Sequence, residues 1–264
     1  MNIEESHLVV LSPCGSTLNC LRVMSDYLPN PLLGHDLTLP ATTQQSRSFG
    51  PEDLVVLGFP VYGGRLPSLA GRVFKSIAGN KTPVVLVAVY GNRDYEDALL
   101  EMQQLAEERG FVPFAAAALV AEHVMEPSVG SKRPDGQDKK AIRKFAKAVC
   151  KSISTYKSVD EISFTAPGQY PFRKPVLRLP FAPVTLKTCR GCALCVDICP
   201  AEAIQDDAAR TADPEICISC MACVLKCPKK ARVIDHPALL NAKQWLSANC
   251  IERREPEFFL KELV

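Results

Sequence analysis

The stretch CRGCALCVDICP at residues 189–200 returns as CISCMACVLKCP at residues 217–228. Each stretch carries three cysteines separated by two residues, then a fourth cysteine after three more residues, followed directly by proline. Every cysteine of the first stretch recurs 28 residues later in the second. This pattern indicates an internal duplication and predicts a small α+β module with pseudo-twofold symmetry.

The spacing of these cysteines favours iron over zinc. A zinc ion usually takes two pairs of cysteines, without a third regularly spaced cysteine and without a Cys-Pro ending. In two-cluster iron–sulfur modules, three close cysteines wrap one cube, and the cysteine before proline reaches the other cube. The segment is similar to bacterial two-cluster ferredoxins, with every ligand position filled. We predict two [4Fe–4S] clusters, one held by Cys189, Cys192, Cys195 and Cys227, the other by Cys217, Cys220, Cys223 and Cys199.

The length, composition and net charge of the chain limit the class of protein to which it can belong. It has 264 residues, 47% of them apolar, and its net charge of +2 indicates neither nucleic acid nor an anionic membrane as a partner. The longest apolar run, residues 111–121, is too short to cross a bilayer. Glu4 and Glu5 precede the first apolar run, which fits no signal peptide. We expect a cytoplasmic protein, in which the four cysteines outside the two stretches are idle or buried thiols: Cys14, Cys20, Cys150 and Cys250.

Up to about residue 155, short apolar runs alternate with helical patterns. Strands are expected at residues 7–11, 54–59, 83–89 and 114–120, with a weaker one at 36–39. A helix is expected over residues 94–109 with Asp94 as its cap, and a closing helix over 137–157. The closing helix has an apolar stripe (Ile142, Phe145, Val149, Ile153) and a basic stripe (Lys139, Arg143, Lys147, Lys151). This alternation predicts a doubly wound parallel sheet covered by helices on both faces.

The first predicted strand runs into Ser12-Pro13-Cys14-Gly15-Ser16-Thr17, where a helix begins at about Thr17. Hydroxyls and free amides at a helix N-terminus form an anion site that suits a phosphate monoester. Gly15 allows a tight turn, and Ser12, Ser16 and Thr17 can donate to phosphate oxygens. Taken alone, the loop could equally be a plain helix cap.

Two later loops follow the next strong strands, on the edge where doubly wound sheets bind ligands. Their glycines and tyrosines suit backbone contacts with, and stacking on, a flat ring. The residues concerned are Pro60, Val61, Tyr62, Gly63 and Gly64, then Tyr90, Gly91, Asn92, Arg93 and Tyr95. No GxGxxG motif occurs, which disfavours a dinucleotide site.

Residues 1–155 resemble a flavodoxin. The resemblance implies FMN, with its phosphate in the first loop and its isoalloxazine between the two later loops. One position departs from the family, since Cys14 stands where flavodoxins often carry threonine. The whole chain resembles the flavodoxin–ferredoxin fusion proteins of anaerobic bacteria and archaea. His123 and the turn Arg133-Pro134-Asp135 also look like features of that group, and we expect them to be structural.

Five prolines interrupt regular structure between residues 166 and 188: Pro167, Pro171, Pro175, Pro180 and Pro183. We predict a flavodoxin-like FMN-binding domain at residues 1–160, a proline-rich linker at 161–184, the cluster module at 185–235 and a C-terminal tail at 236–264. Apolar residues of the tail, such as Trp245 and Phe258, are expected to pack back on the domains.

The leading hypothesis is an electron carrier that passes electrons between the clusters and FMN and exchanges them with a redox protein, either a ferredoxin or an oxidoreductase. The alternative is an FMN-dependent reductase of a quinone, nitro compound or free flavin, with Tyr62, Arg65 and Arg93 as candidate substrate ligands. A third reading is a binding or sensing protein whose first domain has lost its flavin. No acid, base or nucleophile stands out beside the flavin loops, which favours the carrier.

Overall fold

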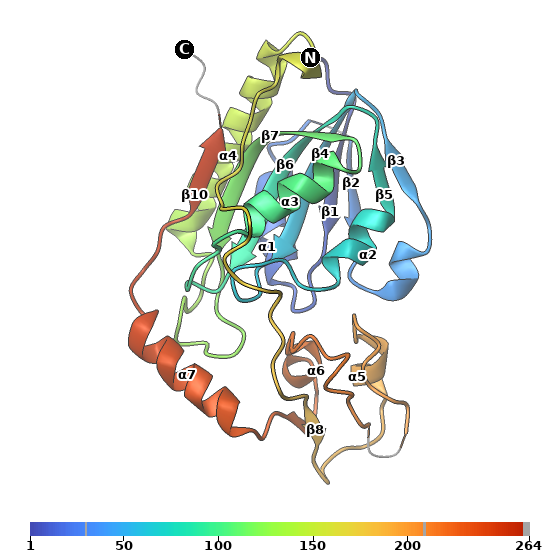
Figure 1. The fold of residues 1–264 in the computed structure, drawn as a ribbon, viewed down its shortest axis with the longest axis vertical. Helices are drawn as coiled ribbons and strands as arrows, with labels where there is room; N and C mark the ends of the chain where they lie inside the picture. Colours follow the sequence, from blue (N-terminus) through green and yellow to red (C-terminus); the bar gives the residue numbers. More distant parts are fainter. Residues whose placement is uncertain (30, 208–209, 261–264) are drawn as a thin grey trace.

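The protein is described by a computed structural model that covers residues 1–29, 31–207 and 210–260. Its core is a six-stranded sheet in the order β10-β7-β6-β4-β1-β2 (Figure 1). Five strands are parallel: β1 (Glu5–Val10), β2 (Leu32–Asp36), β4 (Asp53–Pro60), β6 (Thr82–Tyr90) and β7 (Phe111–Val120). Counted along the chain these five follow the order 2-1-3-4-5, the flavodoxin-like variant of the doubly wound sheet. The predicted fold class is therefore confirmed.

Helices cover both faces of this sheet. α1 (Ser16–Ser25) and α4 (Gly136–Thr155) pack on one face, while α2 (Ala70–Lys75) and α3 (Ala98–Glu107) pack on the other. The central strand β6 serves both layers, because Val85 and Val87 pack toward α1 and α4 while Val84 and Leu86 pack toward α2 and α3. A strand buried on both faces needs continuous apolar sequence, which is why these runs do not alternate with polar residues.

The closing helix confirms its predicted pattern. The apolar stripe of α4 is buried and its basic stripe is exposed. Its N-terminus has a capping box in which the Asp135 carboxylate accepts hydrogen bonds from the amides of Gln137 and Asp138. Two other boundaries were predicted wrongly. β2 ends at Asp36, where the weak strand was expected to begin, and α3 begins at Ala98 because Asp94 instead accepts a hydrogen bond from the Glu96 amide within the preceding loop.

Smaller elements complete this part of the molecule. A separate parallel pair is formed by β3 (Arg47–Phe49) and β5 (Ile77–Gly79), and single 3₁₀ turns lie at η1 (Pro40–Thr43) and η2 (Val159–Glu161). Among the described residues, no helix combines the length and the apolar character needed to cross a membrane.

The cluster segment repeats in its backbone as well as in its sequence. It contains α5 (Leu194–Asp197), α6 (Ala222–Leu225) and the antiparallel pair β8 (Val184–Thr185) and β9 (Arg232–Val233). Each short helix follows a residue in the left-handed conformation, Ala193 (φ 59°) in the first half and Met221 (φ 67°) in the second. The segment lies against the carboxyl ends of the sheet strands (Figure 1).

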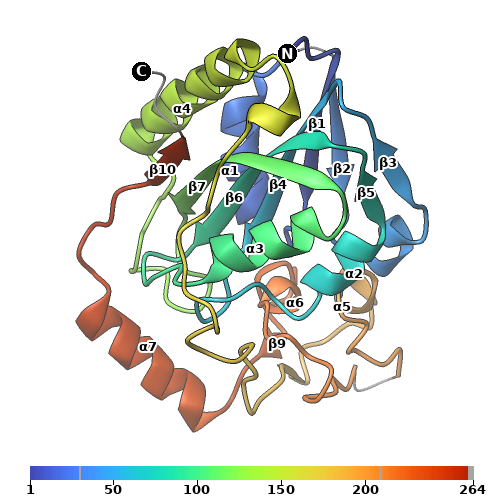
Figure 2. The same cartoon turned by 45° about the horizontal axis from the view of Figure 1, so that its top comes forward.

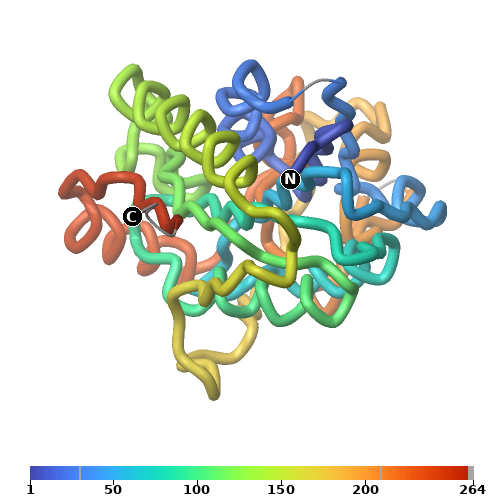
Figure 3. Tube along the Cα trace, turned by 90° about the horizontal axis from the view of Figure 1, so that it is seen from above, coloured from blue at the N-terminus to red at the C-terminus, as the bar shows by residue number. Residues whose placement is uncertain are grey.

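The segment between α4 and the cluster module runs along the outside of the sheet domain, and it is the yellow part of the tube in Figure 3. Asp97, at the start of α3, holds it in place. The Asp97 carboxylate accepts hydrogen bonds from the amides of Gln169 and Arg173 and from the Arg173 guanidinium at 2.7–2.9 Å. These bonds lower the pKa of Asp97 despite the opposing effect of burial.

After the cluster module the chain returns to the first domain. α7 (Pro237–Asn249) passes beside the carboxyl edge of the sheet, and β10 (Glu257–Leu260) then pairs antiparallel with β7 (Figure 2). Phe258 stacks on Phe145 of α4, while Trp245 stays 53% exposed. Apolar residues of the tail were expected to pack back on the domains, whereas a sixth strand was not predicted.

Candidate functional site

A cavity of about 300 Å³ lies at the carboxyl ends of β1, β4, β6 and β7. This volume is at the lower end of the range for small-molecule and cofactor sites, roughly 300–1,000 Å³. Its walls come from the three predicted loops, the loop after β7, the linker, the second cluster loop and α7. The lining residues are Pro13, Cys14, Ser16, Thr17, Pro60, Val61, Tyr62, Gly63, Val89, Tyr90, Gly91, Arg93, Ala121, Glu122, His123, Val124, Met125, Leu177, Leu179, Ile218, Ser219, Ala242, Trp245 and Leu246.

The first loop offers several hydrogen-bond donors to a ligand. Gly15 adopts φ +87°, a conformation that glycine tolerates best, and turns the chain into α1. The Thr17 hydroxyl is buried and has no hydrogen-bond partner in residues 1–29, 31–207 and 210–260. Among the described residues, the amides of Ser16 and Thr17 also lack partners. A buried donor without a partner costs roughly 1–3 kcal/mol, so this cluster of donors fits an anion such as a phosphate.

Ser12 has a supporting part. Its hydroxyl accepts a hydrogen bond from the Leu18 amide at 3.0 Å, and its own amide donates to the Thr38 hydroxyl at 2.8 Å. Neither Ser12 nor Gly15 lines the cavity. Both therefore shape the loop around the donors that face it.

The two tyrosine loops give the cavity flat, neutral walls. Burial raises the pKa of Tyr90 to about 12, and its buried hydroxyl has no hydrogen-bond partner among the residues that the structure describes. Burial, followed by the nearby thiols of Cys220, Cys14 and Cys217, raises the pKa of Tyr62 well above its usual value. Both phenols thus stay protonated at neutral pH and can donate a hydrogen bond. Together with the unpaired Thr17 hydroxyl, the unpaired Tyr90 hydroxyl fits a bound flavin nucleotide with polar edges and a phosphate.

The loop after β7 contributes His123, which the sequence analysis left without a chemical role. Gly91 is required beside it, since a Cβ at position 91 would lie 2.5 Å from the imidazole. Burial lowers the pKa of His123, so the ring is neutral, and its Nδ1 accepts a hydrogen bond from the Met125 amide. Because β7 is a neighbour of β6 in the parallel sheet, its end could have been placed at this edge from the strand pattern.

Three residues expected around the flavin do not line the cavity, and two of them hold the tail instead. The Asn92 amide group donates to the carbonyls of Cys250 and Glu252 at 2.7 and 2.8 Å and accepts from the Arg254 amide. The Tyr95 hydroxyl donates to Glu257 at 2.9 Å. Gly64, with φ +89°, lies outside the lining. Nothing in their sequence context distinguished contacts with the tail from contacts with a ring.

The two arginines considered as substrate ligands, Arg65 and Arg93, differ in whether they line the cavity. Arg65 is buried against Glu101 at 2.8 Å, donates to the Lys174 carbonyl and stacks its guanidinium 3.9 Å from the centre of the Phe172 ring. It does not line the cavity, so it is not available to a substrate there. Arg93 does line the cavity, and one of its buried terminal nitrogens has no hydrogen-bond partner in the described part of the chain.

The eight clustered cysteines surround two further hollows. The first is lined by Cys189, Cys192, Cys195 and Cys227, with Cys223 also at its wall. The second is lined by Cys199, Cys217, Cys220 and Cys223. Apart from the shared Cys223, this grouping matches the crossed ligand sets predicted from the sequence. The arrangement supports those sets, and ligation by these cysteines remains a prediction.

Hydrogen bonds to sulfur repeat between the two halves. The amides of Gly191 and Ser219 lie 3.5 and 3.4 Å from the sulfurs of Cys189 and Cys217. In the same way, the amides of Ala203 and Ala231 each lie 3.3 Å from the sulfurs of Cys199 and Cys227. Such N–H···S contacts stabilise thiolates and adjust the potentials of bound clusters.

The two hollows differ in how deeply their cysteines are buried. Cys192 is exposed, whereas Cys220 and Cys223 are buried. Burial raises the pKa of Cys223 to about 11 and also raises that of Cys220, so metal binding at the second hollow must displace protons from thiols.

The second hollow adjoins the cavity. The Cys14 thiol, whose pKa burial raises to about 12, donates to the Cys220 carbonyl at 2.8 Å. Ile218 and Ser219 line the cavity and the second hollow alike. On the far side, the Arg72 guanidinium donates to the Pro200 carbonyl at 2.7 Å and to the Thr38 carbonyl at 2.8 Å, tying the cluster module to the sheet domain.

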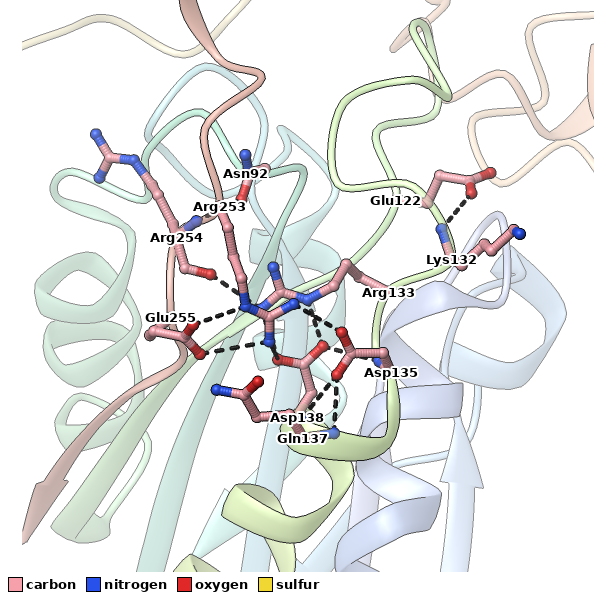
Figure 4. Close-up of polar contacts among 10 residues, drawn as sticks. All are labelled: Asn92, Glu122, Lys132, Arg133, Asp135, Gln137, Asp138, Arg253, Arg254 and Glu255. Carbon is pink, nitrogen blue, oxygen red and sulfur yellow. Dashed lines mark hydrogen bonds and ion pairs between the residues drawn. The ribbon is translucent and has the colours of Figure 1, made fainter.

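The turn at Arg133 fixes the returning tail (Figure 4). The Arg133 guanidinium is buried and pairs with the Asp138 carboxylate, and it also donates to the Arg254 carbonyl at 2.9 Å. Arg253 adds bonds to Asp135 at 2.7 Å and to Asp138 at 3.2 Å. The turn is thus structural, as expected, and the structure adds that it binds the tail.

Comparison with known proteins agrees with this division of the chain. Residues 188–234 match the family described as 4Fe-4S dicluster domain. Protein NrfC of Escherichia coli K12 and that of Shigella flexneri are each 39% identical over 61 residues, which make up 21% of this chain and 27% of the relative. The chain thus spans about a quarter of the length of these curated relatives.

Solved structures resemble the other part of the chain. A flavodoxin from Archaea shares 10% identity over 57% of this chain and 99% of its own, with a TM-score of 0.36. The flavodoxin of Megasphaera elsdenii shares 15% sequence identity over 54% of this chain and 98% of its own, with a TM-score of 0.35. The fold itself is established by the strand order. A 4Fe-4S domain joined to a flavodoxin-like fold suggests electron transfer.

Proposed function

We propose that this chain carries electrons between two [4Fe–4S] clusters and FMN, and exchanges them with a redox protein. The observation that carries the proposal is the shared wall between the flavin cavity and the second cluster hollow. Ile218 and Ser219 border both spaces, and the Cys14 thiol of the first loop bonds to the Cys220 carbonyl. The loop that would hold the FMN phosphate and a loop that would hold a cluster are thereby in direct contact.

The first and third loops have the donors that FMN requires. The Ser16 and Thr17 amides and the Thr17 hydroxyl would bind the phosphate, and the Tyr90 hydroxyl would bind a polar edge of the ring. When bound, FMN accepts and releases one or two electrons at a time. Tyr62 and Leu177 would cover the ring on the side of the linker, while Trp245 and Leu246 of α7 would exclude water from another side.

The clusters are expected to form a short relay. The cluster of Cys217, Cys220, Cys223 and Cys199 would be next to the cavity, because its loop lines it. The cluster of Cys189, Cys192, Cys195 and Cys227 would be the outer one, because Cys192 is exposed. Electrons would then travel between the surface at Cys192 and FMN through both clusters.

The outer cluster has a basic surround that suits an acidic redox protein. Lys187, Arg190, Lys229 and Lys230 are exposed, and each is adjacent or close in sequence to a predicted ligand of this cluster. Surface charge of one sign accelerates encounters with a partner of opposite sign. We therefore propose that the partner is an acidic carrier of the ferredoxin kind, docking beside Cys192.

Stopped-flow mixing tests the relay. Oxidised holoprotein is mixed with a reduced ferredoxin, and absorbance follows clusters and flavin separately. Cluster reduction should precede flavin bleaching, and the bleaching rate should not depend on protein concentration. A Cys192→Ser, Cys220→Ser variant that retains FMN should lose this fast phase.

The matched control is Cys150→Ser, which changes a thiol on α4 outside the cluster segment. It should keep the fast phase unchanged. The relay is wrong if the double cluster variant reduces its flavin as quickly as the original protein.

A further inference from the structure

At the opposite edge of the sheet, where the strands begin, lies a group of three polar side chains that is unrelated to the flavin cavity. Glu5 begins β1 and Asp53 begins β4, and the two are direct partners in the parallel register. His7 lies two residues after Glu5, so it points to the same face of β1. The three side chains therefore converge over the first residues of two neighbouring strands.

Their spacing is wrong for hydrogen bonds but right for ligands around one ion. The His7 Nε2 lies 3.6 Å from a Glu5 carboxylate oxygen and 3.5 Å from an Asp53 oxygen. A zinc ion with bonds of about 2.0–2.2 Å in tetrahedral geometry places its ligand atoms roughly 3.3–3.6 Å apart. All three ligand atoms lie within 4.8 Å of one another.

Within the part of the chain that the structure describes, the imidazole has no other partner on that side. His7 is only 5% exposed, and its Nε2 is buried without a hydrogen bond to any described residue. Its other nitrogen, Nδ1, lies 3.2 Å from the His35 Nε2, and its ring packs edge-on against Phe49. When Nδ1 donates to His35, Nε2 carries a lone pair directed at two carboxylates, an arrangement that a cation stabilises.

We propose that Glu5, His7 and Asp53 bind one Zn²⁺ ion, with a fourth position open to water. An imidazole nitrogen among the donors favours zinc over magnesium or calcium, which prefer oxygen ligands alone. The Glu5 side chain is 45% exposed, so the ion can enter from solvent. Outside this set, His35 orients His7, and the Gly50 amide orients Asp53 by donating to its second oxygen at 2.7 Å. The bound ion joins β1 to β4 at their first residues.

Isothermal titration of the anaerobic holoprotein with zinc chloride tests the site. We expect one high-affinity zinc per chain. Asp53→Asn and His7→Gln should each weaken this binding at least 100-fold, and His35→Ala should weaken it about 10–100-fold, the usual effect of losing an orienting partner. Zinc should also raise the melting temperature of the original protein but not of these variants.

Glu4→Gln is the matched control, because Glu4 is an exposed carboxylate next to Glu5 in the sequence but is not one of the three proposed ligands. It should bind zinc as the original protein does, which separates the site from general surface charge. Free thiols are the same in all variants, so they cannot account for a difference between them. Glu5→Gln serves as a second ligand variant, since the partly exposed Glu5 is replaceable without disturbing the core. The proposal is overturned if the original protein binds no zinc below about 1 mM, or if His7→Gln and Glu5→Gln both bind it unchanged.

Discussion

Cys199 belongs by sequence to the first half of the duplication, yet it lines the hollow built by the second half. Cys199 follows the end of α5 at Asp197 and directly precedes Pro200. Cys227, from the second half, in turn lines the hollow built by the first half. This placement supports the prediction that the fourth cysteine of each stretch binds the cluster of the other half.

Cys199→Ser should consequently alter the inner cluster. Paramagnetic resonance of the reduced protein should change in the same way for Cys199→Ser as for Cys220→Ser, and differently from Cys195→Ser. Cys150→Ser should leave the spectrum unaltered. A Cys199→Ser spectrum that matches Cys195→Ser would show that the ligands do not cross.

Thr17→Val tests the phosphate site with a change of one hydroxyl. The Thr17 hydroxyl is buried without a partner, and a hydrogen bond to a charged group contributes about 1.5–3 kcal/mol. The dissociation constant of FMN from the deflavinated protein should rise roughly 10- to 150-fold, while the cluster absorbance stays constant.

Thr155→Val makes the same change at an exposed position of α4, away from the cavity, and should leave FMN affinity unchanged. Equal affinities for FMN in the two variants would contradict the assignment of the first loop.

At this scale the sequence predicted the residues whose chemistry depends on spacing. The spacing of the cysteines predicted two ligand sets, and the lining of the two hollows supports that grouping, while ligation itself stays a prediction. Asn92 and Tyr95 could not be assigned in the same way. Their partners, Glu252 and Glu257, lie about 160 residues away, and no local pattern records such a contact.

Among the elements, α4 was predicted closely because its amphipathic periodicity marks it, and the structure adds a capping box at its N-terminus. β10 was missed because four residues, Glu257–Leu260, give too short a pattern to distinguish a strand from apolar tail. Its strand conformation depends on pairing with β7. The start of α3 was missed because Asp94 offers an equally good local hydrogen bond one turn earlier.

The buried ion pair between α4 and its preceding turn gives a prediction for stability. Among the described residues, Arg133→Met leaves the buried Asp138 carboxylate with the more distant Arg253 as its one cationic partner. Removing one member of a buried pair costs about 3–5 kcal/mol. We expect the lower end of this range, which lowers the melting temperature of a protein of this size by about 6–12 °C.

Arg143→Met is the control, since it removes an exposed arginine from the same helix and should change the melting temperature by less than about 2 °C. Replacing both partners, Arg133→Met with Asp138→Leu, should recover part of the loss. It cannot recover all of it, because Asp138 also accepts the Asp135 amide in the capping box. Equal melting temperatures for Arg133→Met and Arg143→Met would show that the pair contributes nothing.

For the whole molecule, the two motif regions indicated the two cofactors, and the position of the flavin loops at the rim of the sheet indicated that they face the cluster module, but not which residues make the contact. The contact between Cys14 and Cys220 joins residues 206 positions apart. It depends on the linker held by Asp97 and on α7, which borders the cavity from the other side. A flavodoxin-like domain and a cluster module are recognisable separately, whereas their relative placement follows from packing over the full chain.

The pairing of β10 with β7 has a consequence for synthesis. A ribosome makes the chain from residue 1 onward, so β7 is complete while the cluster segment and residues 257–260 are still untranslated. Until those last residues leave the exit tunnel, β7 is an open edge with unpaired amides and carbonyls, the kind of edge that recruits strands from other chains. Translation speed through residues 121–256 therefore sets how long the nascent protein is exposed to aggregation. Slow codons in that interval should lower the yield of folded protein without any change in its amino-acid sequence.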